Sequence, residues 1–145
     1  MAEHSARPKG VLLIAGILLF AAVMIVIYWI LFFSGAPALS GVPCYMTFET
    51  AFPAADAWLA ITALVGAIGL LTRKSWGVLF ALLGGSASIY LGLMDVLYDV
   101  LNGVYGRLYS PAGTDVAVEI AINVLTLTLG PVIIWYVWSR RHSLL

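Results

Sequence analysis

The chain has 145 residues, of which 63% are hydrophobic and only 10% are charged, and its seven basic and seven acidic side chains cancel. A soluble domain carries about 25% charged residues, so this composition predicts an integral membrane protein. It excludes an ordinary soluble enzyme, a disordered chain and a nucleic-acid binder, which needs a basic face. The single cysteine, Cys44, excludes an intrachain disulfide and a cysteine-based zinc site.

Four apolar stretches are long enough to cross the hydrocarbon core as helices, at residues 11–33, 51–71, 76–101 and 116–138. They are continuous runs, whereas β-barrel strands would be alternating segments of about 10 residues. The first stretch follows basic residues as a signal peptide does, but it exceeds the apolar region of about 7–15 residues of such peptides, so we expect a retained helix. The predicted fold is all-α: one domain, a four-helix membrane bundle.

The basic residues predict how the bundle is oriented. Six of the seven fall on one side of a four-span topology: Arg7, Lys9, Arg73, Lys74, Arg140 and Arg141. Because basic loops stay inside, both termini are predicted to be cytoplasmic in a multi-pass cell-membrane protein. Aromatic residues are predicted to anchor the two interfaces. They are Tyr28, Trp29, Tyr45, Tyr105 and Tyr109 outside, and Trp76, Trp135, Tyr136 and Trp138 inside.

Apart from Glu3, every acidic residue belongs to the predicted outer half: Glu49 and Asp56 on the second span, Asp95 and Asp99 on the third, Asp115 and Glu119 on the fourth. At about 100° per residue, the acids of each span share a face with small residues nearer the cytoplasm, such as Gly84, Ser88 and Gly92 on the third. Small residues let helix backbones approach closely. We therefore expect a bundle that is closed at its cytoplasmic end and opens into an acidic chamber outside.

Helix capping is the structural alternative for some of these acids. Asp115 is expected to cap the fourth span, and Glu49 and Glu119 lie near helix N-termini, where the macrodipole favours carboxylates. Asp95 and Asp99 lie toward a helix C-terminus, where the dipole disfavours them, and an ionisable group at membrane depth marks a functional candidate. Several carboxylates in one semi-dry chamber cannot all stay ionised, so protonated carboxyl groups, which can donate a proton, would lie beside ionised ones, which can accept one.

The predicted site consists of the polar residues that the three later spans turn toward one another in the outer half of the bundle. The predicted catalytic residues are Glu49, Asp56, Asp95, Asp99 and Glu119, and the predicted ligand-binding residues are Asn102, Asn123, Tyr98 and Trp58. Packing is the alternative role for the two aromatic residues, and interhelical hydrogen bonding is the alternative for Asn123. No cofactor and no metal site are predicted. The spacing of Asp95 and Asp99 leaves open whether this pair binds a cation.

Two segments also carry a family resemblance. The sequence IYLGLMDVLY at 89–98, followed by NVLTLTLGP at 123–131, resembles the last helices of the emopamil-binding family of sterol isomerases and sigma-2-receptor-like proteins. Residues 46–50 resemble that family's carboxylate-bearing helix more loosely. The resemblance implies a cavity inside a helical bundle, acidic residues that protonate an alkene, and affinity for hydrophobic amines. It also implies that Glu49 is a proton-handling carboxylate and that Asn123 is a polar partner in the site.

The chain departs from that family in its first span, residues 11–33, which has no His or Glu, and in being shorter by about one helix. The leading hypothesis is a membrane protein whose acidic cavity binds a lipid-soluble or cationic small molecule, with isomerase- or cyclase-like acid–base chemistry as an extension. Proton- or cation-coupled transport and a structural assembly subunit are the alternatives. The expected partners are the lipid bilayer and this small molecule but no nucleic acid, and homo-oligomerisation is left open.

Overall fold

The computed structural model describes residues 9–35, 42, 44–111 and 113–144. These residues form four long helices: α1 (Lys9–Phe33), α3 (Pro53–Leu71), α4 (Ser75–Leu101) and α5 (Gly113–Arg140). A short helix, α2 (Tyr45–Glu49), and a 3-10 turn, η1 (Tyr105–Arg107), lie in two of the connections. Each long helix is long and apolar enough to cross a membrane, and the described residues contain no strand. The predicted all-α, four-helix architecture is confirmed.

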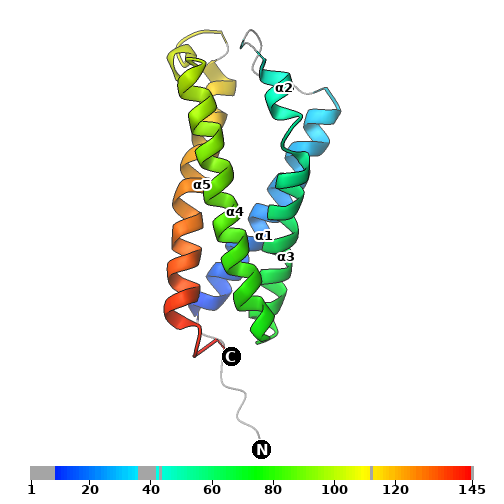
Figure 1. The fold of residues 1–145 in the computed structure, drawn as a ribbon, viewed down its shortest axis with the longest axis vertical. Helices are drawn as coiled ribbons and strands as arrows, with labels where there is room; N and C mark the ends of the chain where they lie inside the picture. Colours follow the sequence, from blue (N-terminus) through cyan, green and yellow to red (C-terminus); the bar gives the residue numbers. More distant parts are fainter. Residues whose placement is uncertain (1–8, 36–41, 43, 112, 145) are drawn as a thin grey trace, which may run out of the picture.

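The four long helices pack as a bundle in which α1 contacts α3, α3 contacts α4, and α4 contacts α5. In Figure 1 the start of α1 and the end of α5 lie at the same end as the α3–α4 connection, which we name the turn end. Helix α2 lies at the opposite end, which we name the α2 end. Toward the α2 end, α1 and α3 lean away from α4 and α5 (Figure 1).

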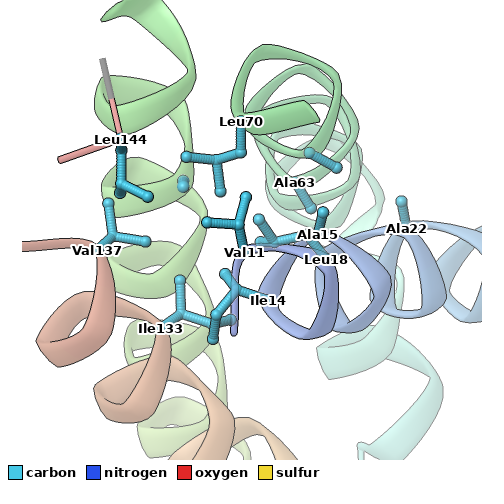
Figure 2. Close-up of a cluster of buried hydrophobic side chains, with 12 residues drawn as sticks. Val11, Ile14, Ala15, Leu18, Ala22, Ala63, Leu70, Ile133, Val137 and Leu144 are labelled. Atoms are coloured by element: carbon cyan, nitrogen blue, oxygen red, sulfur yellow. The ribbon is translucent and has the colours of Figure 1, made fainter. Parts of the chain in front are cut away.

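The main hydrophobic core lies toward the turn end, where α1, α3, α4 and α5 meet. Figure 2 shows side chains of α1, α3 and α5 pointing toward one another, including Ile14, Leu70 and Val137. Several of these side chains are small, and Ala63, Ala67 and Ala81 are completely buried. Burial of small apolar side chains brings the helices close together, so this half of the bundle is dry and tightly packed.

Glycine makes the contact between α3 and α4 especially close. A Cβ atom added to Gly66 would lie 2.7 Å from the Ala81 backbone nitrogen, and one added to Gly69 would lie 2.6 Å from the Gly77 nitrogen. The predicted series of small residues on α4 contacts two neighbouring helices rather than one. Gly84 faces Ala63 of α3, whereas Gly92, two turns later, faces α5.

One boundary differs from the sequence prediction in a way that affects the site. Glu49 was expected on the second span, in helical phase with Asp56, but it ends the separate helix α2. Helix α3 begins at Pro53, which occupies its first turn. Because proline lacks a backbone N–H, it suits the first turn of a helix and disfavours the continuation of a preceding one. Helix α5 also begins earlier than expected, at Gly113.

Candidate functional site

Five carboxylates from four elements gather at the α2 end. We name them the carboxylate cluster: Glu49 at the end of α2, Asp56 in the first turn of α3, Asp95 and Asp99 near the end of α4, and Glu119 near the start of α5. Asp95 interacts electrostatically with Glu49, Asp56 and Asp99, and Glu119 interacts with Glu49, Asp95 and Asp99. The structure thus places all five predicted catalytic residues at one end of the bundle, within range of electrostatic interaction with one another.

Glu49 reaches the cluster from α2 and is almost fully buried. The Tyr28 hydroxyl donates a hydrogen bond of 2.8 Å to Glu49 Oε2. Burial raises the pKa of Glu49, the nearby charges of Asp56 and Asp99 raise it further, and the Tyr28 hydrogen bond acts in the opposite direction. Glu49 is therefore a carboxyl group poised to hold a proton, with a hydroxyl donor beside it.

Helix α1 supplies a second donor next to the first. Trp29 Nε1 donates a hydrogen bond of 2.9 Å to Asp56 Oδ2. Consecutive residues of α1, Tyr28 and Trp29, therefore hold carboxylates of two different helices, α2 and α3. Sequence reasoning missed both roles, because an aromatic side chain with a polar tip near a helix end also fits an interfacial anchor.

Asp99 and Asn123 form the most buried polar contact of the site, with 1% and 4% of their surfaces exposed. Asn123 Nδ2 donates to Asp99 Oδ2 at 2.7 Å and to the Tyr105 hydroxyl oxygen at 3.0 Å. Burial raises the pKa of Tyr105 to about 12, and the neighbouring Asp99 adds to this effect. Among the described residues, nothing hydrogen-bonds to Asp99 Oδ1 or to Asn123 Oδ1. Within the part of the chain that the structure describes, two acceptor atoms are thus buried without a hydrogen-bond donor.

Of the other predicted ligand-binding residues, Tyr98 and Asn102 make structural contacts near the end of α4. Tyr98 stacks on Phe48 of α2, with ring centroids 4.0 Å apart and planes 11° apart. Asn102 donates to the Tyr98 carbonyl oxygen and so closes the end of α4. Trp58 is half exposed on α3. A ligand-binding role for these three residues stays a prediction.

A groove between α4, α5 and η1 adjoins Asn123. Its volume is about 460 Å³, and it is open to the outside of the bundle over much of its extent. The described residues that line it are Val96, Tyr105, Ile120, Asn123, Val124, Leu127 and Thr128. Five of these residues belong to α5 and recur every three or four positions on one face of it, so the groove runs along the axis of α5.

Among the described residues, no group of three or more His, Cys, Asp or Glu side chains is arranged to hold a metal ion. Comparison with known proteins assigns no relative: no protein-family profile, no curated protein and no solved structure matches this chain. The resemblance to the emopamil-binding family therefore stays an expectation.

Proposed function

We propose that this chain is a multi-pass membrane protein with both termini in the cytoplasm. Its four apolar helices support membrane insertion. The basic residues support the orientation, because the described ones at the turn end are Lys9, Arg73, Lys74, Arg140 and Arg141, and only Arg107 lies at the α2 end. Cytoplasmic loops carry an excess of such residues. The carboxylate cluster would then lie in the outer half of the bilayer.

We further propose that the carboxylate cluster binds a lipid-soluble molecule that carries a positive charge. The observation that carries this proposal is the fully buried Asp99, whose Oδ1 has no donor among the described residues. A buried ionised carboxylate is costly by several kcal/mol unless a positive group compensates it. Four further carboxylates nearby add to the negative potential, so a cation entering between them would be stabilised by all five.

Binding fits the bundle better than conduction does. The cluster occupies the α2 end, whereas the turn end is filled by apolar side chains and by close contacts of the α3 and α4 backbones. An ion crossing a single chain would have to pass through this dry core, where a charge is expensive. Passage through the monomer is therefore disfavoured, and a site that opens toward the outer leaflet is favoured.

Acid–base chemistry on the bound molecule is the extension that the emopamil-binding resemblance implies. In it Glu49, whose pKa is raised by burial, delivers a proton to an alkene, and ionised neighbours stabilise the resulting cation. An ionised carboxylate of the cluster would then take a proton from a carbon next to the cationic centre, which completes a double-bond isomerisation, or a cyclisation if a second double bond attacks the cation first. Proton exchange between the two carboxyl groups would restore Glu49 to its starting state. Asp99 and Asn123 then hold the positive centre in place through their buried contact.

Thermal unfolding of the full chain in lipid nanodiscs tests binding, with N,N-dimethyldodecylamine as the probe. Near saturation, the amine is expected to raise Tm by about 5–10 °C, since a ligand at 100 times its Kd adds about 2.7 kcal/mol. Methyl dodecanoate, which has neither charge nor donor, is expected to leave Tm unchanged. Asp99→Asn, which keeps an acceptor for Asn123, is expected to lose about half of the amine-induced shift or more.

Asp115→Asn is the matched control, because Asp115 lies in the first turn of α5 at the same end of the bundle but outside the cluster. It is expected to keep the full amine-induced shift. An equal shift in the wild type and in Asp99→Asn would contradict the proposal, as would an equal shift with the methyl ester. Loss of the shift in Asp115→Asn alone would move the site to the α5 N-terminus.

A further inference from the structure

The groove between α4, α5 and η1 lies beside the carboxylate cluster and meets it at the contact between Asn123 and Asp99. Its α5 wall is made of Ile120, Asn123, Val124, Leu127 and Thr128, which recur with helical spacing on one face. Val124 is 58% exposed, so the groove opens on the outer surface of the bundle. Because both walls belong to helices that are long and apolar enough to cross a membrane, this surface would face lipid tails.

Asn123 places one unsatisfied acceptor beside this groove. Its Nδ2 group donates to Asp99 and to Tyr105, and a carboxylate can only accept, so these bonds fix which way the amide points. Its Oδ1 receives no hydrogen bond from the described residues, although the side chain is 4% exposed and lines the groove. A buried amide oxygen of this kind requires a donor.

The lining shows what kind of donor fits. Asn123, Tyr105 and Thr128 are its polar members, and all three are uncharged amide or hydroxyl side chains. No acidic or basic side chain is among the described lining residues. An ammonium group would lose its hydration in the groove without gaining an interaction with a carboxylate in the lining. A hydroxyl group loses much less hydration free energy on burial. The remaining lining residues are aliphatic and suit a hydrocarbon chain.

We propose that this groove binds a lipid alcohol, a molecule with one apolar chain and an uncharged hydroxyl head. The hydroxyl donates to Asn123 Oδ1, and the chain lies along α5 against Val124 and Leu127. This site requires membrane insertion but does not depend on cation binding by the carboxylate cluster. It makes Asn123 the specificity-determining residue, since this side chain supplies the acceptor that the hydroxyl needs.

Photolabelling of the full chain in nanodiscs tests the proposal with three probes that carry a diazirine in the same alkyl chain: hexadecanol, hexadecane and hexadecylamine. Mass spectrometry locates the adducts. The alcohol is expected to label residues 120–128 of α5 about tenfold more than hexadecane does, which corresponds to one hydrogen bond of about 1.4 kcal/mol. Unlabelled hexadecanol is expected to compete, and the amine is expected to label this segment less than the alcohol.

Two tryptophan variants separate a site from general lipid contact. Val124→Trp fills the groove and is expected to cut alcohol labelling about tenfold. Leu125→Trp is the matched control, because Leu125 is comparably exposed, at 48%, and adjacent in sequence but is not a lining residue. It is expected to keep full labelling. Thr128→Trp repeats the test from another lining position if Val124→Trp does not fold.

Asn123→Leu tests the head group, and it is expected to remove the advantage of the alcohol over hexadecane. Equal labelling by the alcohol and hexadecane in the wild type would overturn the proposal, as would unchanged labelling in Val124→Trp. Stronger labelling by the amine in this groove would also overturn it, because the occupant would then be cationic. Failure of the amine to stabilise the protein leaves these predictions intact, so the two proposals fail separately.

Discussion

Removal of the Tyr28 hydroxyl is expected to destabilise the fold in a pH-dependent way. Tyr28→Phe keeps the ring but deletes the 2.8 Å hydrogen bond to Glu49 Oε2. A hydrogen bond to an ionised group contributes about 1.5–3 kcal/mol, and one between neutral groups contributes about 0.5–1.5 kcal/mol. The variant should therefore lose about 1 kcal/mol where Glu49 is protonated and about 2 kcal/mol where it is ionised.

Because the lost hydrogen bond favours the ionised form more than the protonated form, the variant raises the pKa of Glu49 further. Burial already holds this pKa above its ordinary value of 4.5. The folded state thus binds the proton more tightly than the unfolded state does. The stability that this group contributes is fully present below pH 4.5 and is lost as pH rises through the folded pKa. Tyr28→Phe deepens that loss, so its destabilisation is larger at high pH.

Unfolding by SDS in mixed micelles, at about pH 4 and about pH 8, measures this effect as the difference in unfolding free energy between variant and wild type. Tyr109→Phe is the control, because Tyr109 lies in the same connection as η1 and is 97% exposed. It should change stability little at either pH. An equal loss for Tyr28→Phe at both pH values, or a larger loss at about pH 4, would refute the reasoning.

Two further predictions concern packing and orientation. Gly66→Ala places a Cβ 2.7 Å from the Ala81 nitrogen and is expected to lower the free energy of unfolding by about 1–2 kcal/mol, after the gain in helix propensity is counted. Gly16→Ala, whose Cβ would have nothing within 4 Å, is expected to be neutral or stabilising. SDS unfolding compares the two variants, and equal losses of stability would contradict close α3–α4 packing. Cys44 is exposed at the α2 end, so a membrane-impermeant maleimide should label it in intact cells; labelling only after lysis would reverse the proposed orientation.

The sequence predicted the long helices well because lipid-length apolar runs have few alternative structures. The four expected spans match α1, α3, α4 and α5 to within a few residues at each end. Helix α2 was not predicted, since five residues carry too little periodicity to be recognised. The break between Glu49 and Asp56 depends on Pro53, which either kinks a helix or begins one. Tertiary packing decided this choice.

The acidic side of the site was predictable, and its donors were not. Helical phase alone placed Asp95 and Asp99 on one face of α4, and that face turns toward Glu49 and Glu119. The partners Tyr28, Trp29 and Tyr105 lie 18 to 27 residues away from the side chains that they contact. Their roles depend on how helices lean at the α2 end, and local sequence does not encode that angle.

An experimental structure of the full chain in nanodiscs with N,N-dimethyldodecylamine tests the central claim most directly. We expect density for the amine among α2, α3, α4 and α5, with its nitrogen within hydrogen-bonding distance of Asp99 Oδ1. We also expect that Glu49, Asp56, Asp95 and Glu119 surround that nitrogen. A structure in which Asp99 faces lipid, or in which the amine lies away from these carboxylates, would contradict the account.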